Sequence, residues 1–262
     1  MPEVEVGGVR VAYAAAGEGR PLVLLHGALG SSRLWHRQLE GLAGGFRVLA
    51  WDAPGCGGSS DPPDSWRMPE YADCLAAWLD AVGAERPHVL GLSWGSTLAL
   101  ELYRRHPQVP ASLVLAGAYA GWAGSLPPDV VAERLGKVLG EADRPPEEWA
   151  ESYIPGFVTD AAPEALADEL VALIAEHHPA GSKTMAHAMA EADLRDVLPR
   201  IEVPTLLLYG ELDRRSPLAV AQELRAAIPG SQLVVLPEAA HVCNVERSDE
   251  FDSAVRDFLR AL

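Results

Sequence analysis

The stretch VLGLSWGSTLALELYRRHP, residues 89–107, passes from an apolar run into a helical pattern, and Ser93 lies at the junction between two glycines. A turn this tight leaves no room for Cβ atoms two residues from its apex, which accounts for Gly91 and Gly95. The apex residue takes a strained backbone conformation that exposes its side chain. The stretch therefore predicts a nucleophilic serine between a strand and a helix, provided that other segments supply its partners.

The composition limits the classes of partner. The chain has 262 residues, 48% of them hydrophobic, which is enough for one large α/β core or two small domains. Its 21 Lys and Arg against 37 Asp and Glu give a formal charge of −16. Such a surface repels phosphate groups, so we expect a small-molecule substrate rather than nucleic acid or an anionic membrane. The sequence leaves the choice between monomer and homo-oligomer open.

The expected location is the cytoplasm. The three cysteines are an odd number, which suits a reducing compartment. The first residues, MPEVEVGGVRVAYAAAG, alternate and are acidic, without the basic and apolar regions of a signal peptide. No apolar run approaches the length that spans a bilayer. These features predict a soluble, cytoplasmic protein.

The order of elements predicts the fold class. Two short alternating stretches form a hairpin that turns at Gly7-Gly8, and apolar runs predict six more strands at 21–26, 46–52, 87–92, 111–117, 204–210 and 232–237. Helical spacing between them predicts helices at 32–43, 68–83, 94–106, 217–228 and 246–261. This alternation predicts an α/β fold, in which a mostly parallel eight-stranded sheet has helices on both faces.

The alternation breaks once, between residues 119 and 193. This segment carries helical patterns and several prolines, and no convincing strand. One interpretation is extra helices packed on the sheet; the other is a lid inserted at the carboxyl edge of the strands, where ligands bind in such sheets. We expect the lid, with residues 1–118 and 194–262 forming the core domain and 119–193 the inserted cap.

Two further residues complete a possible catalytic group. A serine nucleophile needs a base that takes its proton and an acid that holds the base. Of the eight histidines, His241 follows the last predicted strand, and Asp213 lies just past the strand at 204–210. The chain order Ser93, Asp213, His241 is that of an α/β-hydrolase, and all three residues follow the carboxyl ends of strands.

Four landmarks in this order make the chain resemble the α/β-hydrolase superfamily along its whole length: HGALGSS at 26–32, DAPGCGGSS at 52–60, GLSWG at 91–95, and GELD at 210–213 followed by AAH at 239–241. The resemblance implies that Ser93 is the nucleophile, His241 the general base and acid, and Asp213 the orienting carboxylate. It also implies an oxyanion hole formed by the backbone N–H groups of Ala28 and Trp94. We expect neither a cofactor nor a metal.

Other residues have competing interpretations. Asp52 is the rival acid, although in resembling proteins this position holds the turn that follows it. His26 is expected to orient the oxyanion loop, and Cys56 does not enter a helix as a nucleophile would. The competing interpretation of Asp213 is a helix-capping aspartate ahead of Ser216-Pro217. His177-His178 point about 100° apart on a helix, which favours solvated lid residues over a metal site.

The apex serine excludes the dehalogenase and epoxide-hydrolase routes, because the resembling enzymes use aspartate there. The segments at 190–213 and 239–251 resemble the enol-lactonase, cofactor-free haloperoxidase and esterase branch, so we expect a carboxylic ester or lactone hydrolase. Proline iminopeptidases and carbon–carbon bond hydrolases are the alternatives, and a small-molecule receptor with little turnover is an alternative of another class. Four aromatic residues either line an apolar pocket or pack the lid onto the sheet: Tyr119, Trp122, Trp149 and Tyr153.

Overall fold

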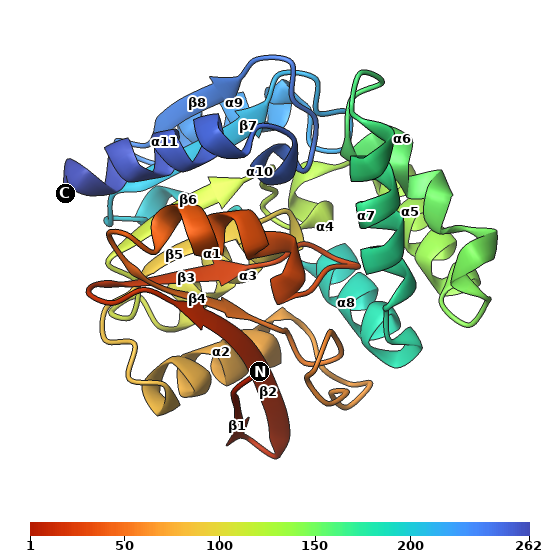
Figure 1. The fold of residues 1–262 in the computed structure, drawn as a ribbon, viewed down its shortest axis with the longest axis horizontal. Coiled ribbons are helices and arrows are strands. Elements are labelled where there is room, and N and C mark those ends of the chain that lie inside the picture. The colour runs from red at the N-terminus through yellow and green to blue at the C-terminus, as the bar shows by residue number, and fades with distance from the viewer.

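The computed structural model describes all residues, 1–262, and contains one eight-stranded sheet in the order β1-β2-β4-β3-β5-β6-β7-β8 (Figure 1). The strands are β1 (Glu3–Val6), β2 (Val9–Ala16), β3 (Pro21–Leu25), β4 (Arg47–Trp51), β5 (His88–Leu92), β6 (Ser112–Ala116), β7 (Thr205–Gly210) and β8 (Gln232–Leu236). The β1–β2 hairpin and the β2–β4 pair are antiparallel, and all other pairs are parallel. The predicted mostly parallel sheet is confirmed.

Helices cover both faces of this sheet, as the sequence predicts. The α-helices of the chain, including α4 to α8 of the segment between β6 and β7, are α1 (His36–Leu42), α2 (Met68–Ala81), α3 (Trp94–Arg105), α4 (Trp122–Ser125), α5 (Pro128–Glu141), α6 (Ile154–Phe157), α7 (Glu164–Ala175), α8 (Pro179–Glu191), α9 (Leu218–Ala227), α10 (Cys243–Glu246) and α11 (Ser248–Arg260). In Figure 1, α1 and α11 lie in front of the sheet, where they contact each other, whereas α2 packs against α3.

The pleat of the central strands explains the two layers. In β3, Val23 and Leu25 belong to the core shared with α2, α3 and α9, and Leu22 and Leu24 to the core shared with α1 and α11. Successive side chains of a strand point to opposite faces, so a strand covered on both sides must be apolar throughout. This is why near-continuous apolar runs identified the parallel strands.

One predicted helix is divided. Residues 32–43 form a 3₁₀ turn, Ser32–Trp35, followed by α1. Asp52 Oδ1 accepts a 2.6 Å hydrogen bond from the backbone N–H of Ser32, and Ser31 Oγ accepts one of 3.4 Å from that of Arg33. These side-chain acceptors hold the tighter first turn, which helical spacing alone does not reveal.

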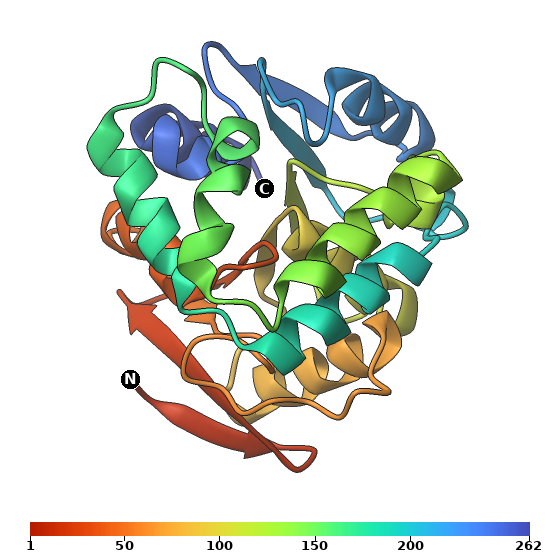
Figure 2. The ribbon, with the colours of Figure 1, turned by 90° about the vertical axis from the view of Figure 1, so that its right-hand side faces the viewer.

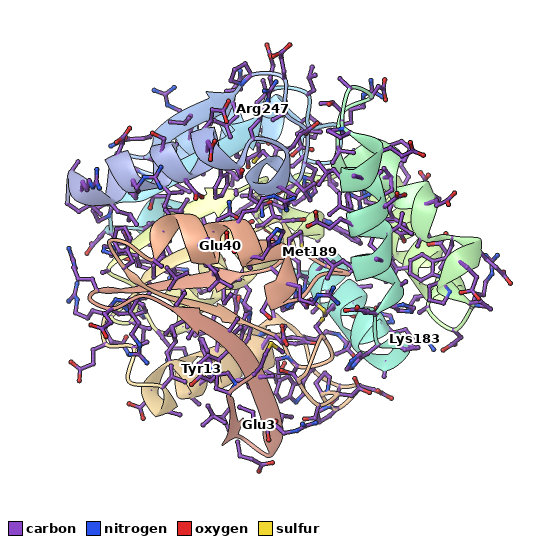
Figure 3. All side chains as sticks on the ribbon, in the orientation of Figure 1. Glu3, Tyr13, Glu40, Lys183, Met189 and Arg247 are labelled. Atoms are coloured by element: carbon purple, nitrogen blue, oxygen red, sulfur yellow. The ribbon has the colours of Figure 1, made fainter.

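The segment between β6 and β7 contains five helices, α4 to α8, and no strand. Figure 2 looks onto these helices and shows α5 and α8 side by side. Helix α8 packs tightly, at Gly181, against the loop of the core domain that contains Gly55. A Cβ atom added at Gly55 would lie 2.5 Å from the Cα atom of Gly181. Figure 3 shows Met189 of α8 toward the middle of the molecule and Lys183 of the same helix nearer the periphery. The description of this segment as a lid remains a prediction.

No helix of the protein combines the length and the apolar character needed to cross a membrane.

The buried carboxyl group of Asp252, in α11, makes the free energy of unfolding depend on pH. Its buried carboxylate accepts a 3.0 Å hydrogen bond from Gln38 Nε2, and burial raises its pKa from 3.8 to about 6. The folded protein therefore binds this proton more tightly than the unfolded chain, so the free energy of unfolding falls as the pH rises from about 4 to about 6, and the full penalty remains above about pH 6. We expect Asp252→Asn to raise the free energy of unfolding by about 1–2 kcal/mol at pH 8 and to lose most of this gain near pH 4. Urea unfolding at both pH values measures it, and an equal difference at both would contradict the assignment.

Candidate active site

Ser93 lies in the turn between β5 and α3 with φ 54° and ψ −113°. A Cβ atom at Gly91 would lie 2.2 Å from the carbonyl oxygen of Gly95, and one at Gly95 would lie 2.1 Å from that of Leu25. Both contacts are far too short, so only glycine fits at either position. The structure thus shows the physical reason for the glycine-flanked serine: the chain turns against itself and against β3.

His241 and Asp213 form a buried pair beside this turn. Asp213 follows β7 and His241 follows β8, and His241 Nδ1 lies 2.8 Å from Asp213 Oδ2. The other carboxylate oxygen, Oδ1, accepts hydrogen bonds of 2.8 Å from the backbone N–H groups of Arg215 and Ser216. Both interpretations of Asp213 therefore apply, because one oxygen holds the turn and the other holds the imidazole.

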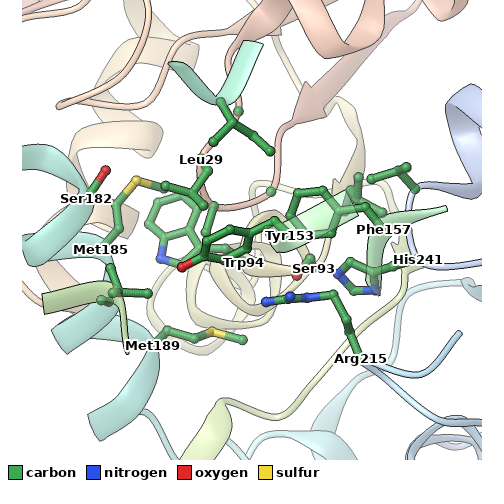
Figure 4. A pocket seen from close by; sticks show the side chains of 18 of the residues that line it. Leu29, Ser93, Trp94, Tyr153, Phe157, Ser182, Met185, Met189, Arg215 and His241 are labelled. Atoms are coloured by element: carbon green, nitrogen blue, oxygen red, sulfur yellow. The ribbon is translucent and has the colours of Figure 1, made fainter. Parts of the chain in front are cut away.

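Ser93 and His241 line the same pocket, and Figure 4 shows the two side chains pointing toward one another. No hydrogen bond joins Ser93 Oγ to His241 in this structure; catalytic hydrogen bonds of this kind tighten when substrate binds. The sequence-predicted residues Ser93, Asp213 and His241 are thus brought together, in an arrangement that can move a proton from the serine to the imidazole.

Ala28 and Trp94 also line this pocket, on the Ser93 side. Trp94 is the first residue of α3, so its backbone N–H has no acceptor within the helix and lies at the positive end of the helix dipole. His26 Nδ1 donates to the carbonyl oxygen of Gly27 at 2.8 Å, and His26 Nε2 accepts from the backbone N–H of Ala53 at 3.0 Å. His26 therefore fixes the loop that carries Ala28, as expected, and is absent from the pocket lining.

The rival residues have other roles. Asp52 accepts backbone hydrogen bonds from Ser32 and Gly58 at 2.6 and 2.8 Å, so it holds two loops together. Cys56 is buried, and burial raises the pKa of its thiol, which opposes formation of a thiolate nucleophile. Cys74 and Cys243 are likewise buried with raised pKa values.

Three of the four aromatic residues proposed for the pocket line it: Tyr119, Trp122 and Tyr153. Trp149 does not, which corrects that expectation. Its ring packs edge-on against Tyr153 and His177, and its Nε1 donates to the carbonyl oxygen of Arg144 at 3.2 Å. It supports the pocket wall from behind.

The adjacent histidines are anchored rather than solvated. His177 Nε2 bonds to the carbonyl oxygen of Ala142 at 3.1 Å, and His178 Nδ1 lies 2.8 Å from Asp61 Oδ1. His178 thereby joins α8's start to a loop of the core. No group of three or more His, Cys, Asp or Glu side chains is placed to hold a metal ion.

Most of the pocket wall was not identified from the sequence. The segment between β6 and β7 adds Phe157 of α6, Leu170 and Leu173 of α7, and Met185 and Met189 of α8. Two arginines also line the pocket, Arg134 of α5 and Arg215 of the loop after β7. The only sequence signal for Arg215 was its place two residues after Asp213.

Comparison with known proteins agrees with this geometry. The sequence model of the alpha/beta hydrolase family matches residues 22–254, so the chain belongs to this family of enzymes. A 2-hydroxy-6-oxononadienedioate/2-hydroxy-6-oxononatrienedioate hydrolase of Pseudomonas putida is 31% identical over 261 residues, covering 95% of this chain and 91% of that protein.

Two solved structures cover nearly the whole chain. A thermophilic esterase from Thermogutta terrifontis has a TM-score of 0.92 and 28% identity, covering 100% of this chain and 99% of its own. The enol-lactonase from Burkholderia xenovorans LB400 has a TM-score of 0.91 and 27% identity, covering 99% of this chain and 100% of its own. The fold, the family and hydrolase chemistry are therefore shared with proteins named for more than one substrate.

Proposed function

We propose that the protein is a serine hydrolase that cleaves a carboxylic ester or lactone through an acyl-enzyme intermediate. The observation that carries this proposal is the buried 2.8 Å contact between His241 Nδ1 and Asp213 Oδ2, which faces Ser93 across one apolar pocket. A carboxylate on Nδ1 fixes the imidazole so that Nε2 is the free base.

In the acylation step, Ser93 Oγ attacks the carbonyl carbon of the substrate while His241 Nε2 takes the hydroxyl proton. The developing oxyanion accepts hydrogen bonds from the backbone N–H groups of Ala28 and Trp94. His241 then gives its proton to the departing alkoxide, and the acyl group stays on Ser93. Water repeats the sequence: His241 takes a proton from it, the hydroxide attacks the acyl carbonyl, and Ser93 leaves with that proton.

An ester or lactone is preferred as substrate because an esterase and an enol-lactonase superimpose on the chain from end to end. The second candidate is hydrolysis of a carbon–carbon bond, which the Pseudomonas putida relative favours. The same triad serves either reaction, so the scissile bond must be found by experiment.

The test is a time course with p-nitrophenyl esters of increasing acyl length and with simple lactones, followed by mass spectrometry of the protein stopped during turnover. We expect multiple turnovers and a transient mass increase equal to the acyl group, on the peptide that contains Ser93. An adduct on another peptide, or no hydrolysis of any ester or lactone by folded protein, would overturn the proposal.

Gly117 tests how closely the His241–Asp213 pair is packed. A Cβ atom there would lie 3.1 Å from His241 Nδ1 and 3.4 Å from Asp213 Oδ2. We expect Gly117→Ala to displace the imidazole and reduce kcat/KM for ester hydrolysis by about 10- to 100-fold. Its φ of +49° adds a backbone cost of about 1 kcal/mol.

Gly7→Ala is the matched control, because Gly7 has φ +59° and a Cβ atom there would meet nothing within 4 Å. This variant should carry the same backbone cost in thermal unfolding with unchanged kcat/KM. Wild-type activity in Gly117→Ala would show that the pair tolerates the contact.

A further inference from the structure

The pocket contains positively charged side chains although most of its lining is apolar. Seventeen of its 24 lining residues are hydrophobic, and the lining contains Arg134 and Arg215 but no Asp or Glu. Figure 4 shows the guanidinium of Arg215 pointing into the pocket beneath Tyr153, toward Ser93. The protein thus places positive charge beside its candidate nucleophile while its overall charge is −16.

No protein group pairs with the Arg215 guanidinium. It forms no ion pair and donates no side-chain hydrogen bond; the Arg215 backbone alone bonds to neighbours. Its side chain instead lies over two lid rings, 5.6 Å from the centroid of Tyr153 and 4.9 Å from that of Phe157. Ring faces attract a cation but leave its N–H groups, which lie in the guanidinium plane, without acceptors.

Arg134 adds a second charge with only neutral partners. It donates hydrogen bonds of 3.1 Å to the hydroxyl of Tyr119 and to the carbonyl oxygen of Arg215. Burial lowers the pKa of the Arg215 guanidinium and outweighs the opposite influence of Tyr119, Tyr153 and the Asp213 carboxylate, while the positive charge of Arg134 also lowers it. The net lowering means that the charged Arg215 is held at a cost in this pocket.

Several arginines elsewhere in the chain have carboxylate partners. Arg37 makes two hydrogen bonds to Glu169, of 2.9 and 2.8 Å, and Arg105 makes two to Asp73, of 2.8 and 2.6 Å. With 37 acidic residues in the sequence, a carboxylate partner for Arg215 was available in composition. Because no carboxylate lines the pocket, the N–H groups of the Arg215 guanidinium are left to bind a group that enters the pocket.

We propose that the substrate carries a carboxylate in addition to its scissile ester or lactone bond, and that this carboxylate pairs with Arg215. A guanidinium matches a carboxylate with two parallel hydrogen bonds, and Arg134 adds to the positive potential around them. The net negative surface does not attract an anion from a distance, so the preference arises inside the pocket. This inference rests on the proposed hydrolysis at Ser93 and specifies its substrate class.

The experiment compares substrates that differ only by this carboxylate. On the acyl side, the p-nitrophenyl half-ester of adipic acid is compared with p-nitrophenyl hexanoate; on the leaving-group side, para-acetoxybenzoate is compared with para-tolyl acetate. For at least one pair we expect wild type to favour the anionic member in kcat/KM by about 10- to 100-fold. The pair that shows the preference tells on which side of the scissile bond the carboxylate lies.

Three variants assign the preference. Arg215→Gln should lower kcat/KM for the anionic substrate by about 10- to 100-fold more than for the neutral one, and Arg215→Lys should recover part of that difference. Arg214→Gln removes the same charge from the adjacent, exposed residue and should behave like wild type. An Arg215 that only holds the lid rings in place would give equal losses for both substrates, which would overturn the proposal.

A binding measurement separates this inference from the proposed function. Calorimetry with adipate on the Ser93→Ala variant needs no turnover, and we expect binding that Arg215→Gln weakens by about tenfold or more. Turnover of neutral and anionic esters without a preference, together with unaltered adipate binding, would overturn the anion site alone. Absence of all hydrolysis with Arg215-dependent binding would overturn the proposed reaction and leave the anion site standing.

Discussion

Replacing Ser93 with alanine is expected to lower kcat/KM for ester hydrolysis by about ten-thousandfold or more while the fold persists. The residue lies at the apex of the turn with φ 54°, on the wall of the pocket that His241 shares. Without Oγ no acyl-enzyme can form, and only water activated by His241 beside the oxyanion N–H groups remains. The Ser93 hydroxyl makes no hydrogen bond within the protein, so its removal costs the folded state little.

The measurements are kcat/KM on a p-nitrophenyl ester and a thermal unfolding curve of the same preparation. Ser253→Ala is the control, because Ser253 is an exposed serine of α11 that does not line the pocket. It should match wild type in both. Comparable turnover by Ser93→Ala and wild type would remove Ser93 from the mechanism.

The sheet could be predicted from the sequence because burial on both faces demands apolar runs. In β5, His88–Leu92, every residue is buried, and the run stands out against its neighbours. The antiparallel hairpin was visible for a different reason: Gly7 and Gly8 both take positive φ, which few other residues adopt readily. The division of residues 32–43 was not visible, because it depends on the Asp52 carboxylate reaching Ser32 across the fold.

The triad residues could be proposed because their order along the chain is informative by itself. Asp213 and His241 each follow a strand of a parallel sheet, and the carboxyl ends of such strands share one edge. Their side chains meet at 2.8 Å, as that placement requires. The catalytic roles of the three residues remain predictions until the variants are measured.

Most of the pocket wall could not be predicted, because it is made by tertiary packing of helices in the segment between β6 and β7. Trp149 and Tyr153 are close in sequence and both aromatic, yet Tyr153 lines the pocket and Trp149 packs behind it. A difference of four residues across one short 3₁₀ turn, Ala150–Tyr153, decides which ring faces inward. The place of Arg215 in the pocket could not be predicted for the same reason. Its neighbour Arg214 is exposed, and the sequence does not distinguish the two arginines.

Asp213→Asn is expected to reduce kcat by about ten-thousandfold through the tautomer of His241 rather than through loss of structure. Asp213 Oδ1 accepts hydrogen bonds of 2.8 Å from the backbone N–H groups of Arg215 and Ser216. An asparagine must keep its oxygen on these donors, which turns its NH₂ group toward His241 Nδ1. Nδ1 then has to accept, the proton moves to Nε2, and the imidazole no longer takes a proton from Ser93.

Because the asparagine oxygen keeps these two hydrogen bonds, we expect the free energy of unfolding of Asp213→Asn to be close to that of wild type. A loss of kcat in this variant would then be a chemical defect and not a structural one. Asp257→Asn, an exposed change on α11, is the matched control and should leave kcat unchanged. Asp52→Asn supplies the contrast: Asp52 accepts backbone hydrogen bonds on both oxygens, so an amide there loses one acceptor and should lower stability more than kcat. If Asp52→Asn instead abolished turnover while Asp213→Asn kept it, the orienting carboxylate would be Asp52, and the contact between Asp213 and His241 would be structural.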